Sequence, residues 1–295
     1  MIIQDIPITG HTVLTGLLGS PVAHSISPLM HNEAFRLLGL DYIYLCFDVT
    51  EETLPEAVAG LKAMGARGFN LTMPNKNRVV ELLDEISPAA RLTKAVNTVV
   101  NENGRLIGTT TDGVGYMQSV IDAGYDIIGK NMTLMGGGGA ASAICAQAAL
   151  DGVQELNIFI RPTSRFYPRM KELTDAINET TSCHASLYDH ADTSSLRSCL
   201  NQSAILVNAT SVGMAPDVNH SIIEDTTLFH EGLIVSDLIY NPRKTRLLSL
   251  AEQSGCKIFN GMYMLLYQGA EAFRIWTGQD MPVEPIKQLY FSDRT

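Results

Sequence analysis

Apolar and polar residues follow two different periods along the first third of the chain. Short apolar runs of strand length alternate with stretches whose apolar residues recur at helical spacing, a pattern typical of α/β domains. Gly65 directly follows the second helical stretch, where a glycine commonly ends a helix. We expect strands over residues 13–18, 42–49 and 66–69, and helices over residues 29–38, 54–64 and about 79–83.

The dipeptide Asn103-Gly104 separates two further apolar stretches, residues 95–100 and 105–108. Asn-Gly between two such arms is a strong signal of a β-hairpin. The second arm runs on to Asp112, which stands next to glycine before an expected helix over residues 116–123. At that position a carboxylate is either the cap of the helix or a functional acid.

The second half of the chain begins a new alternation with a glycine-rich turn. An apolar stretch (132–135) precedes Gly136, Gly137, Gly138, Gly139 and Ala140, and an expected helix (142–150) follows. Gly136, Gly138 and Ala141 fit the pattern G-x-G-x-x-A between strand and helix, which predicts a dinucleotide-binding turn of Rossmann type. The alternative is a tight turn in a similar domain that binds no nucleotide.

The strand expected over residues 156–160 is followed by Arg161 and Arg165, with no acid between them. An acid here would favour NAD, whereas two guanidinium groups can grip the 2′-phosphate of NADP. The sequence therefore leans to NADP, and NAD stays open. Further strands are expected over residues 204–207, 233–235 and 257–259, and helices over residues 263–276 and 285–289.

Several polar residues outside this pattern are candidates for binding or catalysis. Ser27 before Pro28 reads as a helix N-cap, so the hydroxyls of Ser25 and Ser27 can meet an anion at a helix N-terminus or serve as caps only. Lys76 follows a strand end and a turn, where its amine is either an acid–base group or a solvated lysine. Gln268 lies on a mixed helix face and is either a ligand or solvated.

Composition narrows the classes of partner. The 295 residues have a formal net charge of −10, which argues against nucleic acid and anionic membranes as partners. Five scattered cysteines without a C-x-x-C pair indicate free thiols and no zinc site. The N-terminus lacks a basic segment before an apolar core, and no apolar run is long enough for a membrane span. We expect a cytoplasmic protein without a metal.

Eight stretches, read together in this order, resemble the shikimate dehydrogenase family, most closely its quinate/shikimate dehydrogenase branch. They extend from residue 19 to residue 270, so the resemblance covers nearly the whole chain. The stretches are GSPVAHSISP (19–28), NLTMPNK (70–76), AVNT (95–98), TDGVG (111–115), GGGGAA (136–141), NATSVGM (208–214), YNP (240–242) and MLLYQGA (264–270).

The resemblance implies a role for each candidate. Lys76 and Asp112 would form the catalytic pair at the C3 hydroxyl of the substrate. Ser25 and Ser27 would bind the substrate carboxylate, with Tyr240 nearby, and Asn70, Thr72, Asn97 and Gln268 would hold ring hydroxyls. The cofactor would contact the glycine-rich turn, both arginines, Thr210, Ser211 and Met264. The implied activity is the NAD(P)-dependent oxidation of shikimate, in the pathway to aromatic amino acids, or of quinate.

The resemblance also implies two domains with a cleft between them. Residues 1–113 and 262–295 would form an α/β substrate-binding domain, and residues 114–261 a Rossmann-type dinucleotide-binding domain. A monomer or a homodimer is expected. Two other interpretations remain: a folate-type dehydrogenase of similar architecture, and a paralogue that binds NAD(P) or a cyclitol acid without catalysis. The presence of both Lys76 and Asp112 argues against the second.

Overall fold

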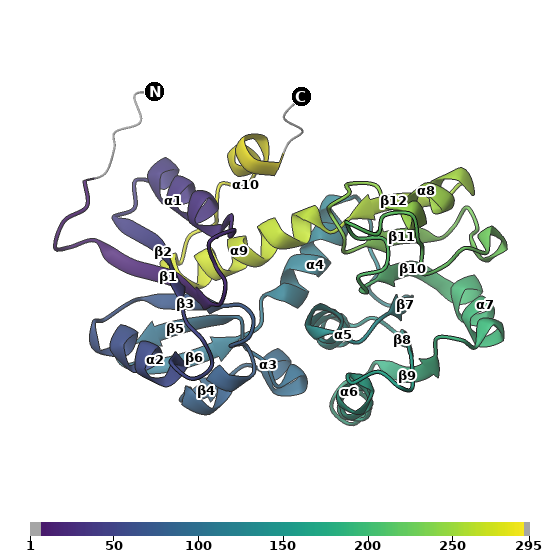
Figure 1. Ribbon diagram of the computed structural model, residues 1–295, viewed down its shortest axis with the longest axis horizontal. Coiled ribbons are helices and arrows are strands. Elements are labelled where there is room, and N and C mark those ends of the chain that lie inside the picture. The colour runs from purple at the N-terminus through teal and green to yellow at the C-terminus, as the bar shows by residue number, and fades with distance from the viewer. Residues whose placement is uncertain (1–6, 292–295) are drawn as a thin grey trace. The chain divides into compact units, whose positions relative to one another are not determined.

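The computed structural model describes residues 7–291, and its chain divides into two compact units. The first unit comprises residues up to Thr111 and from Leu266 onwards, and the second extends from Asp112 to Leu265. The first six residues, which contribute to the expectation that no signal peptide is present, lie outside the described part. Each unit has one six-stranded sheet (Figure 1).

The sheet of the first unit has the strand order β2-β1-β3-β5-β6-β4 and mixed direction, since β5 is antiparallel to both β3 and β6. Its strands are β1 (Val13–Gly19), β2 (Tyr42–Asp48), β3 (Gly68–Leu71), β4 (Glu85–Ile86), β5 (Thr98–Glu102) and β6 (Arg105–Thr109). Its helices are α1 (Ser27–Leu38), α2 (Leu54–Ala63), η1 (Arg78–Leu82), α3 (Pro88–Thr93), the larger part of α9 (Met262–Thr277), α10 (Val283–Ile286) and the π-helical turn η3 (Lys287–Phe291).

Strand β3 separates two cores, because successive side chains of a strand point to opposite faces. Phe69 and Leu71 pack on the buried residues of α2. On the other face, Gly68 leaves room for the Trp276 indole, since a Cβ at residue 68 would lie 2.2 Å from its Nε1. The indole donates to Val99 O at 2.9 Å. This contact holds the C-terminal end of α9 against the first sheet.

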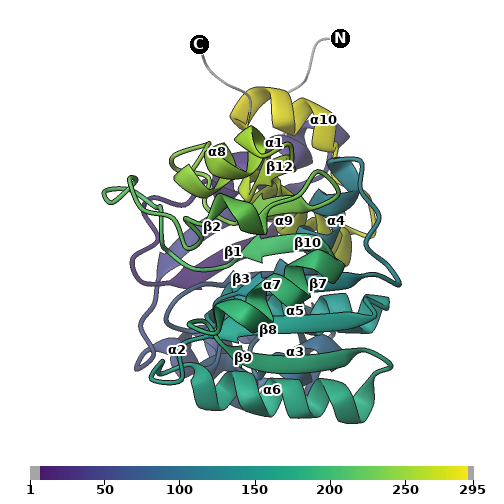
Figure 2. The same ribbon diagram turned by 90° about the vertical axis from the view of Figure 1, so that its right-hand side faces the viewer.

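The second unit has an all-parallel sheet in the order β12-β11-β10-β7-β8-β9, which is the strand order of a doubly wound nucleotide-binding domain (Figure 2). Helices α5 and α6 cover one face, and α7 and α8 the other. The strands are β7 (Asn131–Met135), β8 (Glu155–Ile160), β9 (His184–Asp189), β10 (Ser203–Asn208), β11 (Ile234–Asp237) and β12 (Lys257–Asn260). The helices are α4 (Asp112–Asp122), α5 (Gly139–Asp151), α6 (Tyr167–Thr180), α7 (Thr193–Gln202), η2 (Thr226–Leu228) and α8 (Arg246–Gln253).

The two-unit α/β architecture with a Rossmann-type sheet confirms the predicted fold class. The hairpin is also confirmed: Asn103 (φ 54°) and Gly104 (φ 87°) both have the positive φ that a two-residue turn of this kind requires. One strand boundary was wrong: the strand expected over residues 66–69 extends from Gly68 to Leu71, because Asn70 and Leu71 pair or pack within the sheet. Residues 78–82 form a 3₁₀ helix, close to the helix expected over about 79–83.

Candidate active site

The Asn70 side chain is a hub of hydrogen bonds in the first unit. Its Nδ2 donates to Asn97 O at 3.1 Å and to Thr98 Oγ1 at 3.0 Å, while its Oδ1 accepts from the Tyr44 hydroxyl at 2.8 Å. Asn70 is buried, with 6% of its surface exposed. A buried amide with these partners has one orientation, because a carbonyl oxygen can only accept.

Asn97 joins this hub to the end of the first unit's N-terminal segment. Its Oδ1 accepts from the Thr111 backbone amide at 2.7 Å, and its Nδ2 donates to Thr111 Oγ1 at 3.0 Å and faces Gln268 Oε1 at 3.5 Å. The structure thus brings together three of the predicted ring-hydroxyl ligands, Asn70, Asn97 and Gln268. Asp112 follows Thr111 directly and is the first residue of α4.

The loop from Thr72 to Lys76 is fixed by its backbone. Thr72 N donates to Leu18 O at 3.0 Å, and Ser20 N donates to Met73 O at 3.0 Å. Val96 N donates to Lys76 O at 2.8 Å, so the backbone of Lys76 is adjacent to the residue before Asn97. The half-buried Lys76 side chain therefore starts from a well-defined position beside this polar cluster.

Ser25 and Ser27 lie at the start of α1, but Ser27 is not the N-cap that we predicted. It belongs to the helix, and Ile26 is the residue at the N-cap position. The Ser25 hydroxyl accepts from Ser27 N at 3.2 Å, so Ser25 takes the role of a capping side chain. Both serines are half-buried. Their hydroxyls and the first amides of a 12-residue helix together form a suitable environment for an anion.

The glycine-rich turn of the second unit has the geometry that its pattern predicts. Gly136 has φ +122°, and a Cβ there would lie 2.8 Å from Ala209 O. Gly138 has open space where a Cβ would be, and Ala141 is completely buried between helix and sheet. Gly137 is packed as well, because its Cβ would lie 2.3 Å from Ile160 Cδ1. The turn can therefore receive a phosphate at Gly138, in front of the N-terminus of α5.

A pocket of about 420 Å³ lies beside this turn, entirely within the second unit. It is lined from the ends of β7 and β10, the two strands at which the order of a doubly wound sheet reverses. A nucleotide site is expected at that point. Six of the predicted cofactor residues line it: Gly136, Gly137, Gly138, Arg161, Thr210 and Ser211.

The remaining predicted residues of the second unit have other surroundings. Gly139 and Ala140 begin α5, and Met264 lies in the first turn of α9. The Arg165 guanidinium lies over the Phe166 ring, 4.7 Å from its centroid. Tyr240 is half exposed in the loop after β11.

Hydrogen bonds behind the pocket fix Thr210. Asn208 Oδ1 accepts from Thr210 N at 3.0 Å and from Thr210 Oγ1 at 2.7 Å. Asn208 Nδ2 in turn donates to Asp237 Oδ1 at 3.0 Å. Burial raises the pKa of Asp237, and hydrogen bonds from Thr245, Ile239 and Asn208 oppose that shift. The buried Asp237 carboxyl at the end of β11 thus orients the Asn208 amide, which in turn holds Thr210 of the pocket loop.

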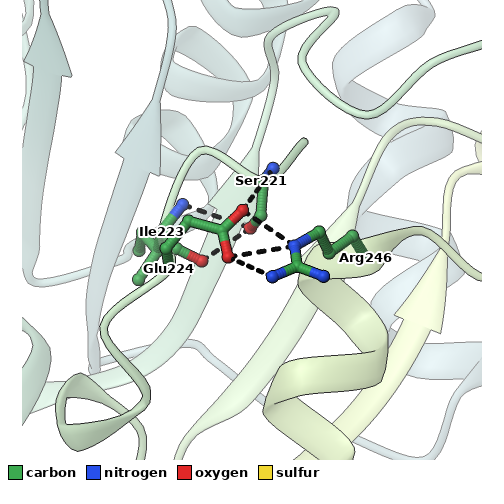
Figure 3. A network of polar contacts seen from close by, with 4 residues as sticks. All are labelled: Ser221, Ile223, Glu224 and Arg246. Atoms are coloured by element: carbon green, nitrogen blue, oxygen red, sulfur yellow. Dashed lines mark hydrogen bonds and ion pairs between the residues drawn. The ribbon is translucent and has the colours of Figure 1, made fainter. Parts of the chain in front are cut away.

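The far end of the same loop is fixed by an ion pair (Figure 3). Arg246 of α8 donates from Nε to both oxygens of Glu224, at 2.8 and 2.9 Å, and from one terminal nitrogen at 2.7 Å. Ser221 N also donates to Glu224 Oε1 at 3.1 Å. Ile222, between these residues, lines the pocket. The ion pair therefore holds one apolar wall of the pocket.

Comparison with known proteins bears on this arrangement. A model described as the shikimate dehydrogenase substrate binding domain matches residues 17–99, and one described as the Shikimate 5'-dehydrogenase C-terminal domain matches residues 261–289. The shikimate dehydrogenase (NADP(+)) of Listeria innocua is 51% identical over 284 residues, which are 96% of this chain and 97% of that protein. The chain belongs to the shikimate dehydrogenase family. This confirms the resemblance found in the sequence.

Solved structures agree with this assignment. The shikimate 5-dehydrogenase of Listeria monocytogenes, in complex with shikimate and NAD, is 51% identical and superposes with a TM-score of 0.94, covering 97% of this chain and 99% of that one. A quinate dehydrogenase from Corynebacterium glutamicum, in complex with NAD, is 27% identical with a TM-score of 0.83, covering 96% and 99%. A shikimate dehydrogenase and a quinate dehydrogenase thus share this fold.

Sequence reasoning missed Tyr44, Ser164 and His190. Tyr44 lies in a strand, and only the pairing of β2, β1 and β3 shows that its hydroxyl reaches Asn70. Ser164 and His190 line the pocket near Arg161. The register of β8 and β9 pairs Ile160 with Asp189, so the residues that follow both strands are neighbours. Strand β9 itself had no clear apolar pattern to reveal this.

Proposed function

We propose that this protein is a shikimate dehydrogenase that oxidises the C3 hydroxyl of shikimate reversibly to the ketone 3-dehydroshikimate, with NADP as the preferred cofactor. The observation that supports this most strongly is the cluster of buried Asn70 and Asn97 with half-buried Gln268, three side chains suited to hydroxyl groups, next to the backbone of Lys76. Two of the relatives named above, both from Listeria, are shikimate dehydrogenases at 51% identity. Quinate is a secondary substrate in this proposal.

The second unit has features that fit a dinucleotide. Gly136 adopts a conformation that other residues rarely adopt, and the open space at Gly138 leaves its backbone accessible to a pyrophosphate. Arg161 lines the pocket where the 2′-phosphate of NADP would lie. The residues directly after β8 include no acid, the residue type that would bind the free ribose hydroxyl of NAD. These features support NADP over NAD. Thr210, Ser211 and the more remote Arg165 and Met264 are secondary cofactor contacts in this proposal.

The chain's own residues bind the substrate and move one proton. The hydroxyls of Ser25 and Ser27 hold the carboxylate at the start of α1, with Tyr240 as a further contact. Asn70, Thr72, Asn97 and Gln268 hold ring hydroxyls and so orient C3. The Lys76 amine and the Asp112 carboxylate are the acid–base pair that takes the hydroxyl proton. When bound, the NADP⁺ cofactor would supply the hydride acceptor for C3. A positioned acid–base group of this kind contributes about 10²–10⁴ to the rate.

This proposal is tested with a matched pair of lysine variants. Lys76→Ala should lower kcat for shikimate oxidation by about 10²- to 10⁴-fold and change the Kd of NADP⁺ little. Lys62→Ala removes an exposed lysine that pairs with Asp84 on the surface, and should keep wild-type kinetics. Equal rates for Lys76→Ala and wild type would refute the catalytic role.

The proposal includes a cytoplasmic location and a monomeric or homodimeric state. All five cysteines are free thiols, four of them buried, which suits a reducing compartment. Among residues 7–291, no helix has the length and apolar character to cross a membrane. Within the same residues, His, Cys and acidic side chains form no group that could hold a metal ion. Sedimentation velocity measures the oligomeric state directly.

A further inference from the structure

The backbone of Tyr44 is held by a side chain of α1. Among residues 7–291, strand β2 is at the edge of the first sheet, so one row of its peptide groups has no neighbouring strand there. Asn32 occupies that position at Tyr44: its Nδ2 donates to Tyr44 O at 2.9 Å, and its Oδ1 accepts from Tyr44 N at 2.8 Å. Both peptide groups of one residue are thereby satisfied, as a paired strand would satisfy them.

The ring of Tyr44 is enclosed by aromatic residues of α1 and α9. His31, the neighbour of Asn32, stacks on it with 4.4 Å between ring centroids and 12° between planes. Trp276 lies 5.9 Å away on α9. The side chain is completely buried. A tyrosine held at its backbone and on its ring has one available rotamer, so its hydroxyl has a fixed position.

That hydroxyl determines which hydrogen bonds Asn70 can make. The two protons of Asn70 Nδ2 are already donated, to Asn97 O and to Thr98 Oγ1. Tyr44 donates to Oδ1 at 2.8 Å, so one lone pair of that oxygen remains. The amide can therefore only accept from a further ligand group. A ligand hydroxyl, which donates a proton, matches this.

The Tyr44 phenol keeps its proton, because burial raises its pKa well above the usual range. That single proton is donated to Asn70 Oδ1. Tyr44 thus fixes the role of Asn70 as an acceptor.

We propose that Tyr44 is a positioning residue for the substrate: its hydroxyl holds Asn70 as an acceptor for one ligand hydroxyl. His31 and Asn32 hold Tyr44 in turn. The proposal rests on the proposed function only for the identity of the ligand, a ring with a carboxylate and hydroxyls. Tyr44 itself is completely buried and acts through Asn70.

The test compares Tyr44→Phe with Tyr42→Phe, the same chemical change two residues away in β2, where the ring packs on Phe35. Tyr44→Phe keeps the ring stack and removes the hydroxyl. The loss of one buried hydrogen bond should raise the KM of shikimate by about 5- to 30-fold. The KM of NADP⁺ should stay within about twofold. Tyr42→Phe should leave both values unchanged.

A double-mutant cycle separates positioning from general damage. If Tyr44 acts through Asn70, Tyr44→Phe should cause no further loss in an Asn70→Ala background. The same factor in both backgrounds would overturn the proposal, as would an equal rise in both KM values. Asn32→Ala is a second variant should Tyr44→Phe fail to fold. It should raise the KM of shikimate by a smaller factor, and an unchanged value would count against the proposal.

Binding of shikimate, followed by the fluorescence of the single tryptophan Trp276, separates this proposal from the proposed function. Turnover by the wild type with unchanged Tyr44→Phe kinetics would overturn the positioning role alone. Should the wild type bind shikimate without turnover, the Kd replaces KM in the same comparison. A wild type that neither binds nor oxidises shikimate would overturn both.

Discussion

The buried histidine of the first unit predicts a specific loss of stability in acid. His31 is completely buried between Tyr44, Phe273 and Trp276, and within residues 7–291 neither of its ring nitrogens has a hydrogen-bond partner. Burial lowers the pKa of His31 from 6.5 to about 3. In the folded protein the ring therefore stays neutral over a pH range in which the unfolded chain binds a proton.

The sign and size of the effect follow from proton linkage. A proton that binds only the unfolded state lowers the free energy of unfolding as the pH falls. The contribution is fully present above pH 6.5 and is lost progressively until about pH 3, where the folded form also titrates. Between about pH 7.5 and about pH 5 the loss from this one residue is about 2 kcal/mol.

The perturbation is His31→Phe, which keeps an aromatic ring against Tyr44 but binds no proton. Urea unfolding of both proteins is followed by Trp276 fluorescence, which reports on the first unit because its ring centroid lies 5.3 Å from that of His31. From about pH 7.5 to about pH 5, the free energy of unfolding of the wild type should fall by about 2 kcal/mol relative to that of the variant. A packing difference between the two proteins would shift this comparison by a constant amount and would not change its pH dependence. Phe273→Leu, in the same cluster, should give a pH-independent offset. A pH-independent difference for His31→Phe as well would refute the reasoning.

Four further substitutions test other parts of the structure. Gly68→Ala should destabilise the first unit by about 2–4 kcal/mol, because its Cβ would displace the Trp276 indole. Gly60→Ala, in open space on α2, should stabilise the same unit by about 0.5–1 kcal/mol. Urea unfolding measures both changes. Gly138→Ala should keep the melting temperature but raise the Kd of NADP⁺ at least about tenfold, because a Cβ would fill the space left for a phosphate. Titration calorimetry measures the Kd, and an unchanged value would exclude this phosphate position. Arg246→Ala should raise that Kd about two- to fivefold, and less at high salt because the ion pair with Glu224 is exposed; a salt-independent effect would point to another cause.

Features determined by neighbouring residues could be predicted from the sequence. The hairpin at Asn103-Gly104 and the turn at Gly136 both require positive φ, and glycine or asparagine in sequence shows this requirement directly. The long alternation of strands and helices indicated the fold class for the same reason. The candidate ligands Asn70, Asn97 and Gln268, which are far apart in sequence, came together through the family resemblance, not through any local pattern.

Features determined by tertiary contacts could not be predicted. The N-cap at the start of α1 was assigned to Ser27, since nothing in the sequence shows that the Ser25 hydroxyl accepts from its amide. Strand β9 was not predicted because it is an edge strand with only one fully buried residue, Ala185, and so has a weak apolar pattern. The contact between Tyr44 and Asn70 depends on the order of three strands, which no local pattern specifies.

The central claim is tested most directly by the initial rates of nicotinamide reduction by the wild-type protein with shikimate or quinate, each with NADP⁺ or NAD⁺. The account predicts the highest kcat/KM for shikimate with NADP⁺, and a preference for NADP⁺ that Arg161→Ala reduces. Folded protein that binds NADP⁺ but reduces it with neither substrate would contradict the account, and would favour a binding protein or a dehydrogenase for another substrate.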